Sequence, residues 1–551
     1  MAGQPTYALK NKSMSTRARD SQAVNILAGK AVAKAVRTTL GPKGMDKMLV
    51  DGLGDIVITN DGATILKEMD IDHPAAKMVV EVAKTQDDAV GDGTTTAAVL
   101  TGELLNMSEE LMNKGVHPTI IATGYRHAAE KATEILDTIT IDVSPDDRET
   151  LAKLAKTALT GKGAGEYKEF LAEVAIDAVL SVVEETEEGL KVDVGDITIE
   201  KRAGGSILDT ELVEGLIIDK ERVRPNMPKR IENAKILLAG FALEFQKIEK
   251  DAEIKIKSPD QMQLFIDQEE KMVKEMVDKV IASGANVVFT QKGIDDLAQY
   301  YLEKAGIYAC RRIKKSDLQK LSKATGATLF QDIADMSPED LGHADLVEER
   351  DVTGTKMTFF TGCKEEKTSS LILHGGTTHI VDTLSRALHD ALCVIGVALE
   401  DKKIVAGGGA PEIELALRLR EYASTLKGRE QLAVTKFAEA FDVIPQTLAE
   451  NAGLDPIDML VDLRLQHEQG NKNAGFDVFT GKVVDMYDND VLEPLRIKTQ
   501  AVNSAMEATV MILRIDDVVA ASRKPSSMPP GAEGMPPGAE GMPPGMPPME
   551  M

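Results

Sequence analysis

Apolar and polar positions in the first part of the chain repeat with the period of helices, interrupted by one extended stretch. The pattern predicts a long helix that begins at Asp20 or Ser21 and runs to about Leu40. Its apolar face is expected to carry Ile26, Leu27, Ala31 and Val32. A second long helix is predicted from Thr94 to about Asn113.

The stretch 48–66 between these helices alternates instead, as strands do. The apolar residues Ile56 and Ile58 precede the corner Asn60-Asp61-Gly62, and a second apolar run follows it. An Asp-Gly pair between apolar segments is typical of a hairpin or a tight turn. We therefore expect the chain to reverse at this corner.

Further along the chain, the pattern of apolar and polar positions changes twice. Residues 147–214 read as short helices followed by strands, and residues 215–362 alternate strand-like apolar runs with helices. Within the second region, the charged stretch 244–279 has few glycines and predicts an extended amphipathic element. Its apolar tip would consist of Met262, Leu264, Phe265 and Ile266.

The last segment, 528–551, contains MPPGAEG twice in succession. Proline removes backbone donors and glycine resists ordering, so this tail is expected to be disordered.

Length and composition narrow the fold class. A chain of 551 residues is too long to fold around a single hydrophobic core, so two or more domains are expected. Aromatic residues make up 4 % and tryptophan is absent, so the core must come from aliphatic side chains. Such a core favours helices and mixed sheets over a large β-sandwich, and the chain is predicted to be a multidomain α/β protein.

Charge and cysteine content exclude several classes of function. The net charge of -25 argues against a nucleic-acid partner, which needs a basic face. The three cysteines show no CxxC pairing and are interpreted as reduced. The N-terminus lacks the apolar run of a signal peptide, and no window approaches the length of a membrane span. We therefore expect a cytoplasmic protein without membrane or nucleic-acid partners.

The strongest chemical signal is the motif GDGTTT at 91–96, directly before a predicted helix. Its glycines let the backbone approach a ligand, and the amides at a helix N-terminus favour an anion. Asp92 supplies a hard oxygen ligand that Mg²⁺ accepts beside phosphate oxygens. The alternative is an ordinary Asp or Thr cap on the helix.

Three other glycine corners are ambiguous when taken singly. Gly41 with Pro42 suits a helix end, and Lys162 in TGKG suits a terminal phosphate or a surface turn. The glycines 407–409 suit a close approach to a ribose or phosphate, or a hinge. No Walker A loop is present, and no GxGxxG lies in a strand-turn-helix context. The residues alone thus predict one Mg²⁺-phosphate site in a protein of several domains.

Taken together, the motifs resemble one family. LGPKGMDKMLV (40–50), TNDGATIL (59–66), GDGTTT (91–96), TGKG (160–163), AGGGAPE (406–412) and ILRIDD (512–517) occur in the order and spacing of the group II chaperonins. That family includes the archaeal thermosome and the eukaryotic cytosolic ring, and the resemblance covers about residues 18–520.

The resemblance implies three domains. A mainly helical equatorial domain would come from 1–146 and 404–527, and a small α/β intermediate domain from 147–214 and 363–403. An α/β apical domain would span 215–362, with the stretch at about 244–279 as a helical lid protrusion. The tail 528–551 would lie outside these domains.

The resemblance also implies roles for single residues. Asp92 would bind Mg²⁺, Asp61 and Asp390 would orient the attacking water, and Lys162 would sense the γ-phosphate of ATP. Further contacts to the nucleotide would come from Leu40, Gly41, Pro42, Asn60, Gly93, Thr94, Thr95, Thr96, Thr160 and Gly161. Gly408 would make the contact on the ribose side, and Glu493 would lie near the ribose or adenine, with Lys498 nearby.

The function implied is an ATP-dependent chaperone that encloses non-native proteins when a built-in lid closes. Its cofactors would be ATP and Mg²⁺, and it would form two stacked rings as a homo- or few-subunit hetero-oligomer. The alternatives are a non-catalytic ring scaffold, against which the three aspartates argue, and a metabolic phosphotransferase, for which no acceptor site is visible. Four candidates for client binding have a helical spacing that favours the core instead, namely Leu297, Tyr300, Tyr301 and Leu302.

Overall fold

A computed structural model describes residues 15–17, 19–50, 52, 54–187, 189–244, 259–363 and 368–519. By its contacts the chain divides into two units. The first contains the two ends of the chain, up to Val24 and from Ile515, and in it β1 (Ser15–Arg17) pairs antiparallel with β20 (Asp517–Val519). The second unit, Asn25–Arg514, holds the candidate site.

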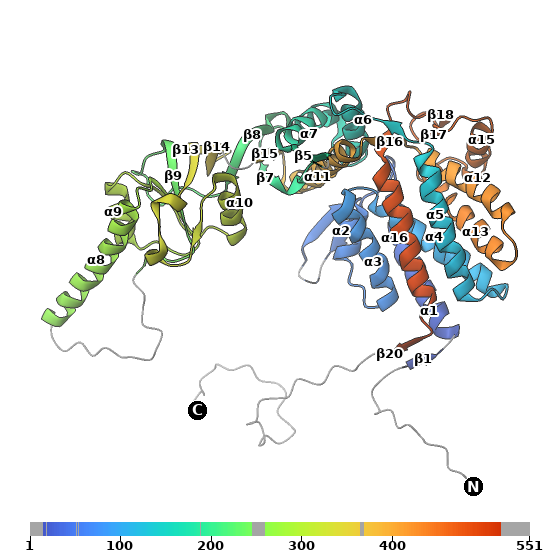
Figure 1. The fold of residues 1–551 in the computed structure, drawn as a ribbon, viewed down its shortest axis with the longest axis horizontal. Coiled ribbons are helices and arrows are strands. Elements are labelled where there is room, and N and C mark those ends of the chain that lie inside the picture. Colours follow the sequence, from blue (N-terminus) through green and yellow to red (C-terminus); the bar gives the residue numbers. More distant parts are fainter. Residues whose placement is uncertain are drawn as a thin grey trace, which may run out of the picture. The chain divides into compact units, whose positions relative to one another are not determined.

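One helical layer of the second unit is built from segments far apart in the sequence (Figure 1). Its largest buried side chains include Tyr125 and Phe437, whose rings meet edge to face at 5.2 Å. Helix α16 (Leu495–Leu513) packs along α4 (Thr94–Asn113) and α5 (Pro118–Asp137). The other helices with residues in this core are α1 (Arg19–Arg37), α2 (Gly62–Glu68), α3 (Pro74–Val90), α12 (Ala410–Thr425), α13 (Arg429–Ala440), α14 (Val443–Asn451) and α15 (Pro456–Glu468).

Short strand pairs accompany these helices. The antiparallel pairs are β2 (Lys47–Val50) with β3 (Ile56–Thr59), and β17 (Ala474–Asp477) with β18 (Lys482–Asp485). A three-stranded sheet joins β16 (Lys403–Ala406) to β4 (Ile141–Asp142) on one side and to β19 (Leu492–Pro494) on the other. This sheet brings two chain segments of the candidate site together, because β16 precedes α12 and β19 precedes α16.

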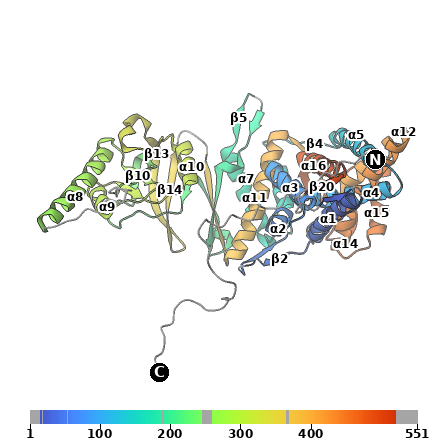
Figure 2. The same ribbon diagram turned by 90° about the horizontal axis from the view of Figure 1, so that it is seen from below.

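A second core gathers around α11 (Thr378–Asp401), α6 (Arg148–Leu159) and α7 (Lys168–Val182). Helix α11 packs on both other helices, and its buried face includes Leu388, Asp390 and Leu392. The strands nearby are the hairpin of β5 (Glu184–Thr186) with β6 (Gly189–Lys191), seen in Figure 2, and β7 (Ile197–Ala203).

A nine-stranded sheet runs in the order β11-β10-β9-β13-β14-β8-β15-β7, with β12 beside β9. Its remaining strands are β8 (Glu211–Ile218), β9 (Arg230–Ala239), β10 (Val287–Thr290), β11 (Tyr308–Cys310), β12 (Leu329–Phe330), β13 (Gly342–Val352), β14 (Thr355–Cys363) and β15 (Ser369–Gly375). Three helices alternate with strands β9 to β12 along the chain, namely α8 (Pro259–Ala282), α9 (Asp296–Lys304) and α10 (Lys315–Thr325).

The predicted mixture of helical and α/β structure is confirmed, and helix α4 has the predicted bounds. The first helix departs from prediction at its start and on its face. It begins at Arg19, so neither Asp20 nor Ser21 caps it, and Leu27 is 66 % exposed. Ala31 is exposed as well, and the buried face carries Ile26, Val32, Ala33 and Val36.

The corner at 60–62 also differs from the hairpin that we expected. The hairpin reverses earlier, between β2 and β3, and Asp61 is the N-cap of α2, accepting the amide hydrogen of Thr64 at 2.7 Å. An Asp followed by Gly fits a helix cap as well as a turn, and the apolar run after it forms the buried face of α2.

Several other expectations can be compared with the described residues. Leu302 is buried, Leu297 and Tyr301 pack partly buried against the same core, and Tyr300 alone is exposed, so the core interpretation of that helix is largely confirmed. The three cysteines are free, as predicted. Residues 245–258 of the predicted lid, the side chains of its apolar tip and the tail 528–551 lie outside the described residues. No helix in the described part combines the length and apolar character that crossing a membrane requires.

Candidate functional site

The loop between α3 and α4 leaves the first amides of α4 open. Gly91 ends α3 with a φ of +69°, and Gly93 is the N-cap of α4 with a φ of +77°, a region that only glycine adopts freely. No side chain caps the first turn of α4, so the alternative of an ordinary Asp or Thr cap is wrong. Instead, Oδ1 of Asp92 accepts the amide hydrogen of Gly93 at 2.8 Å. The N-terminal amides of α4, from Thr94 onward, can therefore meet an anion.

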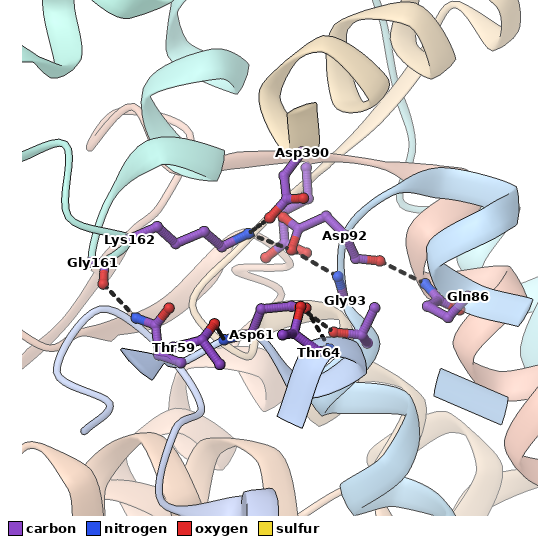
Figure 3. A network of polar contacts seen from close by, with 12 residues as sticks. Thr59, Asp61, Thr64, Gln86, Asp92, Gly93, Gly161, Lys162 and Asp390 are labelled. Carbon is purple, nitrogen blue, oxygen red and sulfur yellow. Dashed lines mark hydrogen bonds and ion pairs between the residues drawn. The ribbon is translucent and has the colours of Figure 1, made fainter. Parts of the chain in front are cut away.

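A single ammonium group joins this loop to helix α11 (Figure 3). Nζ of Lys162 lies 2.9 Å from Oδ1 of Asp92 and 2.7 Å from Oδ2 of Asp390. The Asp390 side chain is only 10 % exposed, against 21 % for Lys162 and 29 % for Asp92. Three residues from distant parts of the sequence, each with an implied role, thus meet at one point.

Asp61 approaches the same point from α2. Its Oδ2 caps that helix, and its Oδ1 accepts the hydroxyl hydrogen of Thr94 at 3.1 Å. Asn60 donates its amide hydrogen to the carbonyl oxygen of Gly161 at 2.6 Å, which ties the corner before α2 to the loop after α6. These contacts place a carboxylate, a hydroxyl and two backbone loops around Lys162 (Figure 3).

The loop 40–42 lies against the loop that carries Lys162. A Cβ atom added to Gly161 would come within 2.8 Å of Cα of Pro42, and Gly161 has a φ of +83°. Leu40 is buried in the helical core, so only its backbone can face a ligand. Thr160 is the C-cap of α6 and donates its hydroxyl hydrogen to the carbonyl oxygen of Lys156.

Burial and the surrounding charges shift the acids of the site. Burial raises the pKa of Asp390 well above its ordinary value; Lys162 opposes this effect, whereas Asp92 and Asp61 add to it. Burial, followed by the charges of Asp61 and Asp88, raises the pKa of Asp87 to about 6. Burial works against the Lys162 ammonium, yet Asp390 and Asp92 outweigh it and hold its pKa above the ordinary value.

The residues that we predicted for the ribose side form a second group. Glu493 lies on β19 opposite Val405 of β16, the strand that ends immediately before the glycines 407–409. Nζ of Lys498 lies 2.6 Å from Oε2 of Glu493. Gly408 has a φ of +64°, and an added Cβ would lie 2.9 Å from the terminal carbon of Met486. The charge of Asp92 contributes to the raised pKa of Glu493, which relates the two groups.

Two residues near the site were not predicted from the sequence. Gln86 is fully buried and donates its side-chain amide hydrogens to the carbonyl oxygens of Asp92 and Ile497, so it links the loop 91–93 to α16. Asp87 adds a further carboxylate to the cluster around Lys162. The pair Asp87-Asp88 directly before GDG was the only sequence signal for the second residue, and nothing in the sequence pointed to Gln86.

The residues of the site fit a Mg²⁺ ion that takes most of its ligands from substrate phosphates and water. In the described ranges, no three His, Cys, Asp or Glu side chains converge to hold a metal ion by themselves. The cluster nevertheless has more carboxylates than cations, and burial together with the neighbouring carboxylates raises the pKa of Asp87 and of Asp390. Mg²⁺ is commonly bound by one or two carboxylates together with substrate phosphates and water, which suits Asp92 beside an open helix N-terminus.

The fold thus places an ion-paired loop directly before the uncapped N-terminus of α4. Residues 32–523 match the TCP-1/cpn60 chaperonin family. The chain is 59 % identical over 534 residues to the thermosome subunit beta of Archaeoglobus fulgidus, covering 97 % of this chain and 98 % of that one. It is also 59 % identical over 503 residues to the thermosome subunit of Methanopyrus kandleri, covering 91 % and 92 %.

A solved structure agrees with these relatives. The open state monomer of a group II chaperonin from Methanococcoides burtonii is 64 % identical, with a TM-score of 0.63, and the match covers 77 % of this chain and all of that one. The chain therefore belongs to the TCP-1/cpn60 chaperonin family. The predicted group II chaperonin is confirmed, and with it an ATP-hydrolysing ring protein that assists protein folding rather than a metabolic phosphotransferase.

Proposed function

We propose that ATP binds with Mg²⁺ across the loops described above and that its hydrolysis is coupled to the position of helix α11. The observation that carries this proposal is the Lys162 ammonium between Asp92, before α4, and Asp390, on α11. In this proposal Asp92 holds the metal, and the amides of Gly93 to Thr96 receive the phosphates. The backbone at Gly41, Pro42 and Gly161 encloses them.

The chain's own groups have the chemical character that phosphoryl transfer to water requires. Such transfer depends on positioning and on charge neutralisation more than on covalent chemistry. Bound Mg²⁺ would neutralise phosphate charge, and Lys162 would move from Asp92 and Asp390 to the γ-phosphate as a point charge. Asp390 would then orient the attacking water and accept its proton, for which a raised pKa is suited. Asp61, fixed by its two hydrogen bonds, would hold the same water from the other side.

The proposal extends to domain layout and to partners. The helical core draws on 26–139 and 405–513, the core around α11 mainly on residues 143–404 with Val90, Leu492 and Ile497, and the cores of the large sheet on residues 213–372. These groupings support the predicted equatorial, intermediate and apical domains, with the boundaries given above. We propose that displacement of α11 closes a lid formed by about 244–279 over non-native clients, in two stacked rings of one or few kinds of subunit. The predicted cytoplasmic location is part of this proposal.

The metal assignment is tested by titrating Mg²⁺ against ATP turnover in assembled rings. Replacing Asp92 with Asn should raise the Mg²⁺ concentration for half-maximal turnover and lower the maximal rate by about a hundredfold or more, because a metal contributes several kcal/mol to such transition states. The exposed neighbour Asp88, replaced in the same way, is the matched control. Equal Mg²⁺ dependence of the two variants would show that Asp92 is not the metal ligand.

The coupling is tested by limited proteolysis of the segment 244–279. MgATP should slow cleavage there in the wild-type ring, and the Asp390→Ala ring should lose turnover and this protection together. Full protection without turnover would show that ATP binding alone closes the segment. Cleavage that ignores nucleotide in both rings would contradict the lid.

A further inference from the structure

Two carboxylates share one ammonium group next to the glycines 407–409. Nζ of Lys498 lies 3.0 Å from Oε1 of Glu412 and 2.6 Å from Oε2 of Glu493. Lys498 is 7 % exposed and Glu412 is 4 % exposed, so this pairing lies inside the protein. Glu412 stands in the first turn of α12 and Lys498 in the first turn of α16, and both also line a small cavity together with Thr96 of α4.

The pairing leaves one oxygen of Glu493 directed at the glycine loop. The register of β16 and β19 places Glu493 opposite Val405, and the amide of Gly407 donates to the carbonyl oxygen of Val491 at 2.8 Å. A Cβ atom added to Gly407 would lie 3.0 Å from Oε1 of Glu493. While Lys498 occupies Oε2, Oε1 therefore remains available beside a backbone that carries no side chain.

Burial of the Glu412 carboxylate costs free energy that this structure does not fully offset. Its Oε2 has no hydrogen-bond partner in the described part of the chain, although the atom is buried. Lys498 with Glu493 alone would balance one charge against one, so the second carboxylate adds a negative charge that a purely structural pair would not need. Buried ion pairs are weak sources of stability, which directs attention to what this geometry positions.

We propose that Glu412 is a positioning residue for ribose recognition, acting through Lys498 on Glu493. By holding Lys498 from the α12 side, Glu412 prevents the ammonium from neutralising Glu493 completely and keeps Oε1 in place to accept hydrogen bonds from ribose hydroxyls. Lys498 itself would then position Glu493 rather than contact the nucleotide. The inference rests on the proposed function, in which ATP binds across these loops, and adds that the ribose of that ATP lies at Glu493.

The charges around Glu493 give a second readout. Burial raises the pKa of Glu493; Lys498 opposes this effect, and Glu412 and Asp92 add to it. Removing Lys498 would raise this pKa further, so the carboxyl group would stay protonated up to a higher pH. A protonated carboxyl group is a weaker acceptor. Ribose recognition in a Lys498→Met ring should therefore weaken as the pH falls and recover as it rises.

The experiment compares ATP with 2′-deoxy-ATP and 3′-deoxy-ATP as substrates of intact rings, for wild type and for Glu493→Gln, Lys498→Met and Glu412→Gln. A hydrogen bond to a charged group corresponds to about tenfold or more in kcat/KM, so wild type should prefer ATP by that ratio. Glu493→Gln should remove the preference, and Glu412→Gln should reduce it by at least about threefold, mainly through KM. Lys498→Met should show the pH dependence described above.

The matched control is Glu414→Gln, which removes an equally buried carboxylate from the same helix. Glu414 pairs with Arg418 and His467, both at 2.8 Å, and has no contact with the Lys498 pair. If Glu414→Gln loses the preference as much as Glu412→Gln does, the effect is a general one on α12 and the inference fails. If only Glu493→Gln loses it, the inference fails and the ribose assignment stands. If Glu493→Gln keeps it, the ribose does not lie at Glu493 and the inference fails, while the metal and phosphate contacts of the proposed function are unaffected.

Discussion

Replacing Asp390 with Asn separates the chemical role of this residue from its structural role. The substitution removes the charge that faces Lys162 at 2.7 Å and keeps the shape of the side chain. Breaking a buried ion pair usually costs about 3–5 kcal/mol, because a charge is left without a partner. Here Lys162 keeps Asp92 at 2.9 Å, and burial already disfavours the ionised form of Asp390. We therefore expect a loss of only about 1 kcal/mol in the free energy of unfolding.

The loss in turnover should be much larger. A group that orients water and accepts its proton contributes about 10²–10⁴ in rate, which corresponds to about 3–5 kcal/mol on the barrier. An amide can occupy the same place but cannot accept the proton. Turnover at saturating MgATP should therefore fall by at least about a hundredfold, while the affinity for MgATP changes little.

Phosphate release, calorimetric titration of nucleotide and thermal unfolding measure these three quantities on the same rings. The control is Asp382→Asn, which changes an exposed carboxylate on the same helix that pairs with Lys201 at 2.8 Å. Intact Asp390→Asn rings that hydrolyse ATP within about threefold of the control would refute the reasoning, since general-base effects are not that small.

Two further predictions concern the neighbours of this pair. Because Asp87 has a pKa of about 6, acidification through pH 6 should remove a negative charge from the site, and ATP turnover should fall there; Asp87→Asn should flatten this limb of the pH profile. The folded protein binds the extra proton between the ordinary value of 3.8 and about 6, so wild type, relative to Asp87→Asn, should lose stability as the pH rises through that window. Gly161→Ala should lower both the melting temperature and turnover, whereas Gly115→Ala, with a φ of +81° and no atom near its Cβ, should cost only the backbone strain of about 1–2 kcal/mol. Equal losses in the two glycine variants would contradict the close approach to Pro42.

Local patterns predicted some elements well and others badly, for physical reasons. Helix α4 was predictable because glycines delimit its start and apolar residues continue through its length. The face of the first helix was misjudged because positions 26, 27, 31 and 32 spread over more than half of the circumference of a helix, so they cannot all be buried on one side; Ile26 and Val32 are buried, and Leu27 and Ala31 are exposed. Asp61-Gly62 was ambiguous because turns and helix caps favour the same residues.

The candidate site shows a different limit. GDGTTT indicated an anion site from its residue types alone. The ion pair of Lys162 with Asp390 joins residues 228 apart in the chain, and the resemblance implied only that each acts on the nucleotide. The pairing of Glu412 with Lys498 was not predicted at all, although Glu412 ends the motif AGGGAPE, because a motif does not show which distant charge its residues meet. Tertiary contacts between charged side chains have no local signature, and the structure is needed to find them.

The double attachment of Lys162 bears on the order in which ligands arrive. Oδ1 of Asp92 already accepts the lysine ammonium and the amide of Gly93, so a divalent ion that comes alone must compete with an internal cation. A triphosphate offers that lysine a new partner at the moment it delivers the metal. Metal and nucleotide should therefore enter as one complex, and the same exchange would free Asp390 to meet water.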